Sequence, residues 1–394
     1  MWTPAGAPLT DGDIAVILAG SGGRGITLDT APTLLGVELR GSWNLLSDGN
    51  PRSLILRAAD SASPYLHIGA SNADSVNSTG DLVLKTGVSL SLEGGTFLLG
   101  SPDTANGGSR AGTTTLTVES GATLNIGTDE KHALWQMAQH NPSSNHTRVS
   151  SLAVQAGASA AFYLTDFQVG GYNGSSDGGG KAEGTVDLSA ATVTAFDVSG
   201  DVRIGRGNSH QAGSFGTVKL PKLNGNIDGH LLVGDSPTRS EGRLELNGTH
   251  LEVGGDVTID LTGRVKVTLG EGAGGLRLSA GSELIINASG AGAGDEAAGY
   301  FIDFGNATFS GGELLYGLAW EGDHLEALDL LVNSYAITWS NGPDGLTAGL
   351  FYDAAADLTY IGMAPIPEPG AVSLLAGGAA LLACLGRRLK RPVA

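Results

Sequence analysis

Cysteine is almost absent from this sequence: its 394 residues include one, Cys384, close to the C-terminus. A single cysteine excludes an internal disulfide, and the chain before it has neither a thiol nucleophile nor a thiolate metal ligand. Aromatic residues are scarce at 6%, and charged residues make up 16%. Val, Leu and Ile are nevertheless too frequent for a disordered chain. Stability must therefore come from packed and hydrogen-bonded backbone structure alone.

Basic residues are outnumbered almost two to one. Lys and Arg total 22 against 40 Asp and Glu, which gives a net charge of −18. The segment after Gly370 holds four basic residues and no acidic one, so residues 1–369 carry −22. A body this acidic repels phosphate, and its sequence shows no clustered basic run. We expect no nucleic-acid partner.

Glycine is the abundant residue, with 63 copies, more than twice the usual share of roughly 7%. Collagen would need glycine at every third position, and that period is absent. The composition favours a β-rich fold with many turns. Length alone suggests two or three domains, but a solenoid can run the whole distance as one unit because each coil contacts only its neighbours.

Two short patterns recur when the chain is aligned on its glycines. The first pattern is found at 184–188 (GTVDL), 216–220 (GTVKL) and 242–246 (GRLEL), spaced 32 and 26 residues apart. The second pattern is found at 200–204 (GDVRI), 229–233 (GHLLV) and 255–259 (GDVTI), which begin 16, 13 and 13 residues after their partners. Apolar residues alternate within each segment, as in a half-buried strand. Two short strands per repeat are therefore predicted.

Apolar strands ending in glycine extend this pattern upstream. The terminal glycines are Gly69, Gly100, Gly127, Gly170, Gly205 and Gly234, at intervals of 31, 27, 43, 35 and 29 residues. A unit of about 30 residues is typical of stacked coils, with glycine tolerating the sharp corners. We predict an all-β fold: a right-handed parallel β-helix over residues 1–290. A β-sandwich or an array of hairpins is the structural alternative.

Two regions interrupt the repeat. The segment 128–139 (TDEKHALWQMAQ) favours a short helix capped by Thr128, and an insertion of about 128–148 would explain the 43-residue interval. The second interruption is rich in aromatic residues, because 11 of the 22 lie between Tyr300 and Tyr360. We expect residues 291–364 to form a β-rich cap over the last coil, whose strand edges would otherwise be open.

Metal sites are not indicated. His132, His140 and His146 lie near Asp129 and Glu130, but they are eight and six residues apart, whereas ligands on one helical face are three or four apart. Acidic turns at 176–180 (SDGGG) and 234–236 (GDS) suit calcium in ligand type but lack the fixed aspartate of a calcium repeat. Ordinary turn chemistry accounts for both turns, and no cofactor is expected.

Catalysis is the main alternative to a structural role, since parallel β-helices also carry polysaccharide lyases and hydrolases. The best acidic group is Glu321, Asp323 and His324 after Trp320, and it lies in the expected cap. Carboxylate pairs occur by chance in so acidic a chain, so we expect a surface cluster and no catalytic residues. Trp320, Trp339 and Tyr352 are a third possibility, as a carbohydrate-stacking surface, although packing is the more common role.

The C-terminus has three unlike features in a fixed order. Pro367, Glu368 and Pro369 precede an uncharged apolar stretch, 371–386, and the basic residues Arg387, Arg388, Lys390 and Arg391 follow it. As a helix the stretch would be about 24 Å long, short of the roughly 30 Å hydrocarbon core, so it would engage a bilayer but anchor poorly. Basic residues after an apolar segment favour the cytoplasmic side, which would place residues 1–369 on the other side.

This order resembles the PEP-CTERM sorting signal of Gram-negative bacteria over residues 365–394. The resemblance implies an exosortase in the inner membrane as partner, with Pro367, Glu368 and Pro369 at the recognition positions and release toward the cell surface. The repeats resemble the adhesin-like, autotransporter-type passengers joined to such signals. The resemblance implies a non-enzymatic, exported cell-surface or matrix protein, with the exopolysaccharide of a biofilm as a further partner.

Export also requires an N-terminal signal, and none is recognisable in residues 1–19. The only apolar stretch there, 14–19 (IAVILA), follows Asp11 and Asp13 and has no basic region before it. We therefore expect that a leader precedes Met1 or has been removed.

Overall fold

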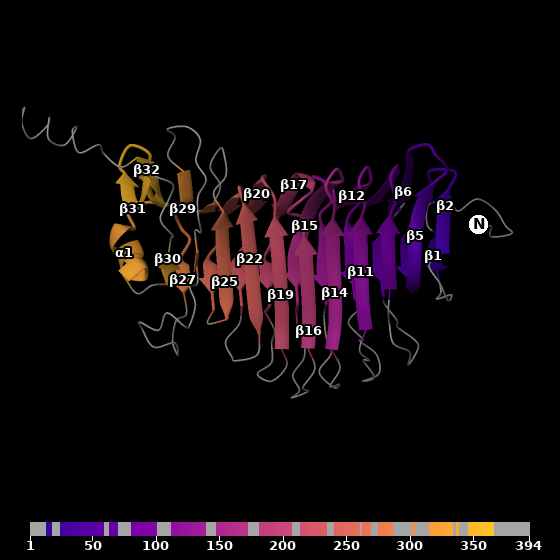
Figure 1. Cartoon of the computed structure of the whole chain (residues 1–394), viewed down its shortest axis with the longest axis horizontal. Helices are drawn as coiled ribbons and strands as arrows, with labels where there is room; N and C mark the ends of the chain where they lie inside the picture. Colours follow the sequence, from indigo (N-terminus) through magenta and orange to yellow (C-terminus); the bar gives the residue numbers. More distant parts are fainter. Residues whose placement is uncertain are drawn as a thin grey trace, which may run out of the picture.

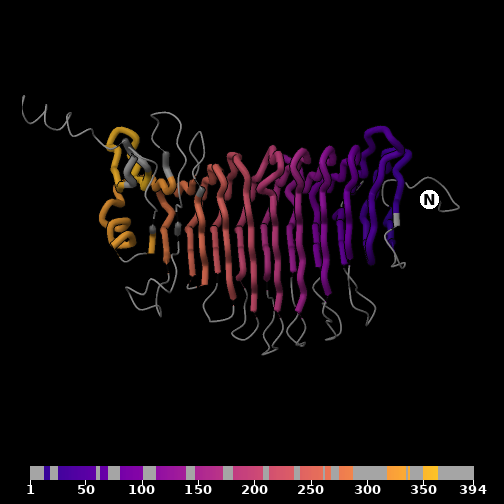
Figure 2. The backbone as a smooth tube through the Cα atoms, in the orientation of Figure 1, coloured from indigo at the N-terminus to yellow at the C-terminus, as the bar shows by residue number. Residues whose placement is uncertain are grey.

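The fold is mostly β, and strands of neighbouring coils lie side by side along the long axis (Figure 1, Figure 2). The computed structural model describes residues 13–17, 24–58, 63–69, 80–100, 112–138, 147–171, 181–206, 213–234, 240–260, 262–268, 275–286, 302–303, 315–333, 336–338 and 346–365. Within these residues the strands form long parallel ladders with regular spacing, as in a parallel β-solenoid.

Each coil contributes to three parallel ladders, which we number in the order in which the chain visits them. Ladder 1 is an 11-stranded sheet of β2 (Arg24–Leu28), β5 (Gly41–Ser47), β8 (Gly80–Leu84), β11 (Gly112–Val118), β14 (Thr147–Val154), β16 (Lys181–Asp187), β19 (Gly213–Leu220), β22 (Glu241–Asn247), β25 (Gly263–Thr268), β28 (Ile302–Asp303) and β30 (Ile337–Thr338). Ladder 2 contains β3 (Thr33–Leu34), β6 (Arg52–Leu56), β9 (Val88–Leu92), β12 (Thr123–Ile126), the first half of β15 (Ser159–Val169), β17 (Thr192–Val198), β20 (Asn224–Ile227), β23 (His250–Val253), β26 (Gly275–Leu278) and β29 (Leu315–Glu321). Ladder 3 contains β1 (Ile14–Ile17), β4 (Gly36–Leu39), β7 (Tyr65–Ile68), β10 (Gly95–Leu99), β13 (Ala133–Met137), the second half of β15, β18 (Val202–Ile204), β21 (Leu231–Val233), β24 (Val257–Ile259) and β27 (Leu284–Ile286).

The repeats seen in the sequence stack in register. In ladder 1, Gly184 pairs with Gly216 and Gly216 with Gly242, so the first pattern forms β16, β19 and β22. In ladder 3, Val202 pairs with Leu231 and Leu231 with Val257, which places the second pattern on β18, β21 and β24. Both predicted strand sets are confirmed, and their parallel pairing excludes an array of hairpins over this region.

The expectation of two strands per repeat is wrong, because a third strand lies between the two patterns. It is β17, β20 or β23 in successive coils. β20 has the sequence NGNI, in which only Gly225 and Ile227 are buried, so its apolar signal is weak. Its pairing with β17 and β23 compensates for that weakness by backbone hydrogen bonds between coils.

Corner glycines have the positive φ that the sequence predicts. They end strands of ladder 3, with φ of 71°, 74°, 66°, 62° and 76° at Gly69, Gly100, Gly170, Gly205 and Gly234. Gly127 has φ 79° but follows β12 of ladder 2. The corresponding ladder 3 corner of that coil is Ala138, with φ 50°. The 43-residue interval therefore joins corners of two different kinds.

The helix predicted after Thr128 is also wrong, because residues 133–137 form strand β13. Lys131 N–H donates to Thr128 Oγ1 at 3.0 Å, which resembles a helix cap but closes a tight turn. Ala133, Trp135 and Met137 then point inward and are fully buried. Their period of two, together with pairing to β10 and β15, outweighs helix propensity. Residues 139–146 of the expected insertion lie outside the described residues.

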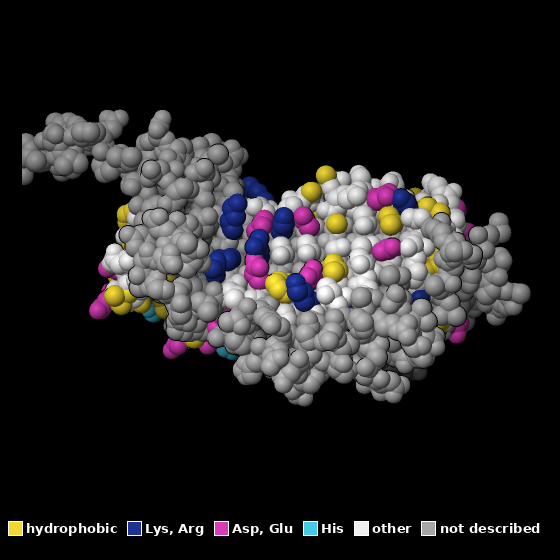
Figure 3. Space-filling view, turned by 60° about the horizontal axis from the view of Figure 1, so that its bottom comes forward, with side chains coloured by type: hydrophobic (Ala, Val, Ile, Leu, Met, Phe, Trp, Pro, Cys, Tyr) yellow, Lys and Arg dark blue, Asp and Glu magenta, His cyan; other side chains and the backbone are white. Residues whose placement is uncertain are grey.

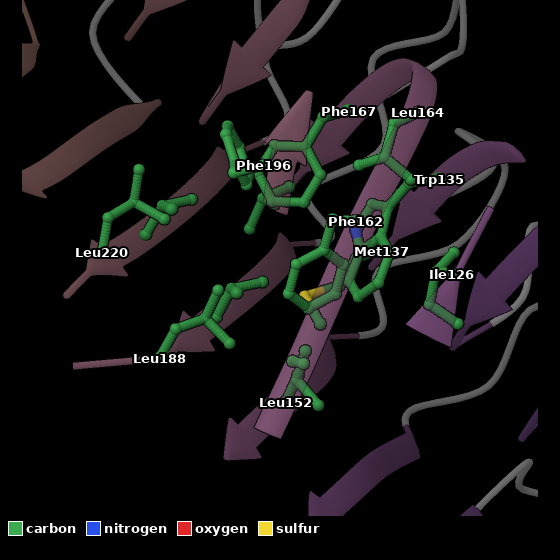
Figure 4. Close-up of a cluster of buried hydrophobic side chains, with 14 of the residues drawn as sticks. Ile126, Trp135, Met137, Leu152, Phe162, Leu164, Phe167, Leu188, Phe196 and Leu220 are labelled. Carbon is green, nitrogen blue, oxygen red and sulfur yellow. The ribbon is translucent and has the colours of Figure 1, made fainter. Parts of the chain in front are cut away.

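A cluster of buried aromatic side chains fills part of the interior (Figure 4). Phe97 and Trp135 stack with ring centroids 4.2 Å apart, and Trp135 contacts Phe167 at 5.4 Å. Phe167 meets Phe196 edge-on at 5.5 Å. These buried rings come from ladders 2 and 3 of successive coils, so their packing joins the coils at this level.

The C-terminal end changes from parallel to antiparallel pairing. β29 pairs in parallel with β26 and antiparallel with β32 (Leu358–Pro365), which pairs with β31 (Leu346–Asp353). The helix α1 (Leu325–Asn333) follows β29 and buries Leu328 completely. The expected β-rich cap thus contains a helix that the sequence did not predict, and ladder 1 continues into this region through β28 and β30.

Candidate functional site

The acidic group proposed from the sequence lies at the junction of β29 and α1, and its side chains serve the fold. Glu321 accepts from Arg277 Nη2 at 2.8 Å and from Ala280 N–H at 3.2 Å. Asp323 accepts from Leu325 N–H at 3.3 Å at the start of α1. His324 stacks on Trp320 with centroids 3.7 Å apart. The structure brings the three residues together, but each side chain already has a partner within the fold, and those of Glu321 lie on β26 and in the turn after it.

The aromatic residues considered for carbohydrate stacking do not form one exposed surface. Trp320 is 6% exposed and donates from Nε1 to Ser282 O at 3.1 Å. The Tyr352 hydroxyl donates to Asp357 Oδ1 at 2.9 Å, a bond that raises the pKa of Tyr352. Trp339 lies outside the described residues. Trp320 therefore packs, as the more common role of such residues suggested.

The histidines and acidic turns considered for metal give only partial geometry. His132 is half-buried, with Nδ1 3.2 Å from Leu164 O. Residues 176–180, His140, His146, Asp235 and Ser236 lie outside the described residues. Within the described ranges no group of three or more His, Cys, Asp or Glu side chains is placed to hold a metal ion.

A side-chain ladder that the sequence did not predict runs along the start of ladder 3. Asp166 Oδ1 accepts from Asp201 N–H at 3.1 Å, and Asp201 Oδ1 accepts from His230 N–H at 2.9 Å. His230 Nδ1 accepts from Asp256 N–H at 2.9 Å, and Asp256 Oδ1 accepts from Glu283 N–H at 2.9 Å. Each side chain therefore satisfies a backbone donor of the next coil. The recurring Gly-Asp and Gly-His pairs were its signal in the sequence.

A cluster of three titratable side chains lies on the outer side of ladder 3 near the N-terminal end, and it consists of Glu38, Tyr65 and His67. Tyr65 and His67 have ring centroids 4.6 Å apart, and Glu38 pairs in register with His67. Burial lowers the pKa of His67, so the neutral imidazole is favoured. Burial and the neighbouring Glu38 raise the pKa of Tyr65. The Tyr65 ring also occupies the space beside Gly36, where a Cβ would lie 2.6 Å from it. This contact indicates a packing role.

The outer face of ladder 1 is a regular surface built on an 11-stranded parallel sheet. One outward column runs through Thr115, Ser151, Thr185, Thr217, Arg243 and Arg264 on successive strands. A second column, two residues further along each strand, runs through Thr117, Ala153, Asp187, Lys219, Glu245 and Lys266. Hydroxyl and small side chains therefore give way to charged ones toward the C-terminal end (Figure 3).

Ion pairs join coils on several faces. Lys85 Nζ lies 2.5 Å from Glu119 Oε1, and Lys219 Nζ lies 3.8 Å from Glu245 Oε2. Arg57 forms two hydrogen bonds of 2.5 Å with Glu93, which lowers the pKa of that carboxyl. Because the side chains of these pairs are partly exposed to solvent, each pair contributes little to stability.

The residues of the sorting motif, the apolar stretch and the basic cluster lie outside the described residues: Pro367, Glu368, Pro369, 371–386, Arg387, Arg388, Lys390 and Arg391. In the part of the chain that is described, no helix has the length and apolar character needed to cross a membrane.

Comparison with known proteins finds no match: no family model, no curated protein and no solved structure is similar to this chain. The site must therefore be assigned from residues and geometry. The described residues offer a long, regular outer surface, with hydroxyl and charged columns whose positions are set by backbone pairing between coils.

Proposed function

We propose that this chain is an exported, non-enzymatic structural or adhesin-like protein of the surface or extracellular matrix of a Gram-negative bacterium. Its C-terminal segment, residues 365–394, would be a sorting signal read by an exosortase. Pro367, Glu368 and Pro369 form the recognition motif, and 371–386 enters the inner membrane transiently. Arg387, Arg388, Lys390 and Arg391 hold the end of the chain on the cytoplasmic side.

One observation carries the proposal: a three-part C-terminal signal follows a body whose described strands form long parallel ladders. Stacked coils make a stiff rod because each coil is fixed to two neighbours, and a rod can present the same weak contact many times. We propose a right-handed coil, because parallel strands joined by a crossover are right-handed in about 98% of cases. The exopolysaccharide of a biofilm is the proposed partner outside the cell.

Expression of the full-length gene in a host with and without its exosortase tests the sorting proposal. We expect the surface fraction to contain a species shortened at the C-terminus only when the exosortase is present, as measured by intact mass. Glu368→Ala should abolish the shortening, whereas the matched control Glu326→Ala, on the exposed side of α1, should not. A surface species that retains residues 387–394 in the exosortase host would refute the proposal.

A further inference from the structure

The charge of one part of ladder 1 is opposite to that of the whole chain. On β19, β22 and β25 the outward charged residues of the two columns are Lys219, Arg243, Glu245, Arg264 and Lys266. Four of these five are cationic, although residues 1–369 carry −22. Dark blue side chains accordingly gather at the C-terminal end of this face (Figure 3). We call these four cations the basic band.

Two arginines of the basic band lie side by side. Arg243 and Arg264 are register partners on β22 and β25, about 4.8 Å apart along the axis. Like charges directly opposite each other on a sheet are destabilising, so the fold gains nothing from this pair. Burial lowers the pKa of Arg264, and Arg243 lowers it further, while Glu241 raises it. Glu241 already lies beside Arg243, and Arg264 Nη1 donates to Gly263 O at 2.6 Å, so a ligand carboxylate would add a second anion beside the pair.

The neighbouring residues limit what such an anion can be. Arg243 is held by Glu241 of the same strand, and its side chain remains 60% exposed. Thr217, the register partner of Arg243 on β19, adds a hydroxyl beside the pair. The ring of Phe215 on the same strand is covered by the Lys181 ammonium, whose Nζ lies 5.1 Å from the ring centroid. Guanidinium groups bind carboxylates through two parallel hydrogen bonds, and a hydroxyl suits the polar edge of a sugar.

Double-stranded DNA and a polyuronate are both polyanions, but they differ in linear charge density. Double-stranded DNA carries about one charge per 1.7 Å, so the acidic surface around the basic band would repel it along its whole length. A polyuronate carries one carboxylate per sugar, a density closer to that of isolated cations on rungs about 4.8 Å apart.

We propose that the basic band binds an anionic polysaccharide that bears carboxylates, with Arg243 and Arg264 holding carboxylates and Lys219 and Lys266 flanking them. This inference deepens the proposed function and rests on it, since it names the class of matrix polymer that the rod would hold. Glu241 competes with the ligand for Arg243 and sets the affinity.

Binding of polygalacturonate to the purified full-length chain tests the inference, independently of sorting. The double variant Arg243→Gln/Arg264→Gln should bind at least tenfold more weakly, and Glu241→Gln at least twofold more tightly. Arg52→Gln/Arg57→Gln, with the same change of charge at the other end of the rod, should stay within twofold of the parent. Circular dichroism of each variant checks that the outward-facing substitutions leave the fold intact.

Three results would overturn the inference. Equal binding of the parent and the Arg243/Arg264 variant excludes the basic band. Equal binding of fully methyl-esterified polygalacturonate, or of dextran sulfate, shows that carboxylates are not recognised. Tighter binding of single-stranded DNA than of polygalacturonate assigns the band to nucleic acid. Because the sorting experiment measures mass and this one measures affinity, failure of one is distinguishable from failure of the other.

Discussion

Replacement of a single corner glycine should open the contact between two coils. Gly170 follows β15 with φ 66°, and a Cβ at this position would lie 1.9 Å from Phe215 O and 2.4 Å from Phe215 C. Both atoms belong to the backbone of β19, so no side chain can rotate away. Gly170→Ala must therefore either separate the two coils or change the corner.

The change in the free energy of unfolding caused by Gly170→Ala has three contributions. A left-handed φ costs a residue with a Cβ about 1–2 kcal/mol, and overpacking costs about 1–3 kcal/mol more. Alanine also lowers the conformational entropy of the unfolded chain, which stabilises the folded state by about 0.4–1 kcal/mol. The net loss is about 1–4.6 kcal/mol, whose upper end is a large share of the stability of a typical domain.

Alanine substitutions at two other glycines distinguish the cost of backbone strain from the cost of the steric clash. Gly49 has φ 98° with nothing within 4 Å of its Cβ position, so Gly49→Ala carries backbone strain alone. Gly281 has open space and no positive φ, so Gly281→Ala should be neutral or slightly stabilising. Urea unfolding followed by circular dichroism should rank the midpoints Gly281→Ala, Gly49→Ala, Gly170→Ala, from highest to lowest. A midpoint for Gly170→Ala equal to that of Gly49→Ala would refute the steric argument.

Three further predictions concern side chains between coils. Trp135→Ala should cost about 3–5 kcal/mol in urea unfolding because the ring is fully buried, whereas Trp135→Phe should cost less, since it also removes an indole N–H that has no partner among the described residues. His230→Ala should cost about 1 kcal/mol and speed amide exchange at Asp256, and His230→Asn, which keeps an acceptor, should restore slow exchange; unchanged exchange in His230→Ala would contradict the side-chain ladder. The pKa of His67 is lowered in the folded chain, so below its ordinary value of 6.5 the unfolded chain binds a proton that the folded chain does not, and stability should fall as pH drops. His67→Gln should remove that part of the pH dependence of thermal unfolding, and an identical pH profile would contradict it.

Much of the solenoid was predictable because its signals are local. Alternation in the segments 184–188 and 200–204 identifies strands, and the glycine after each ladder 3 strand identifies a corner. Strand β13 and the corner at Ala138 were missed because their conformation is imposed by neighbouring coils. Intrinsic propensity favours a helix for the Ala-Leu-Trp-Gln-Met segment and disfavours a left-handed conformation for alanine.

The candidate surface was less predictable for the same reason. Arg243 and Arg264 are 21 positions apart, and nothing in the sequence says that they become register partners. The net charge of −18 even pointed away from a basic surface. Conversely, Glu321, Asp323 and His324 are close in sequence, but Arg277 and α1 give their side chains structural partners.

The sequence by itself determined the class of fold, the strands of two ladders and the order of features at the C-terminus, because period-two alternation, glycine corners and an apolar run are properties of contiguous residues. Only the tertiary structure decided ladder 2, the side-chain ladder from Asp166 to the backbone of Glu283, and the basic band. Each of these depends on which residues of different coils become neighbours, and that register is set by the stacking of whole coils through backbone hydrogen bonds and interior packing.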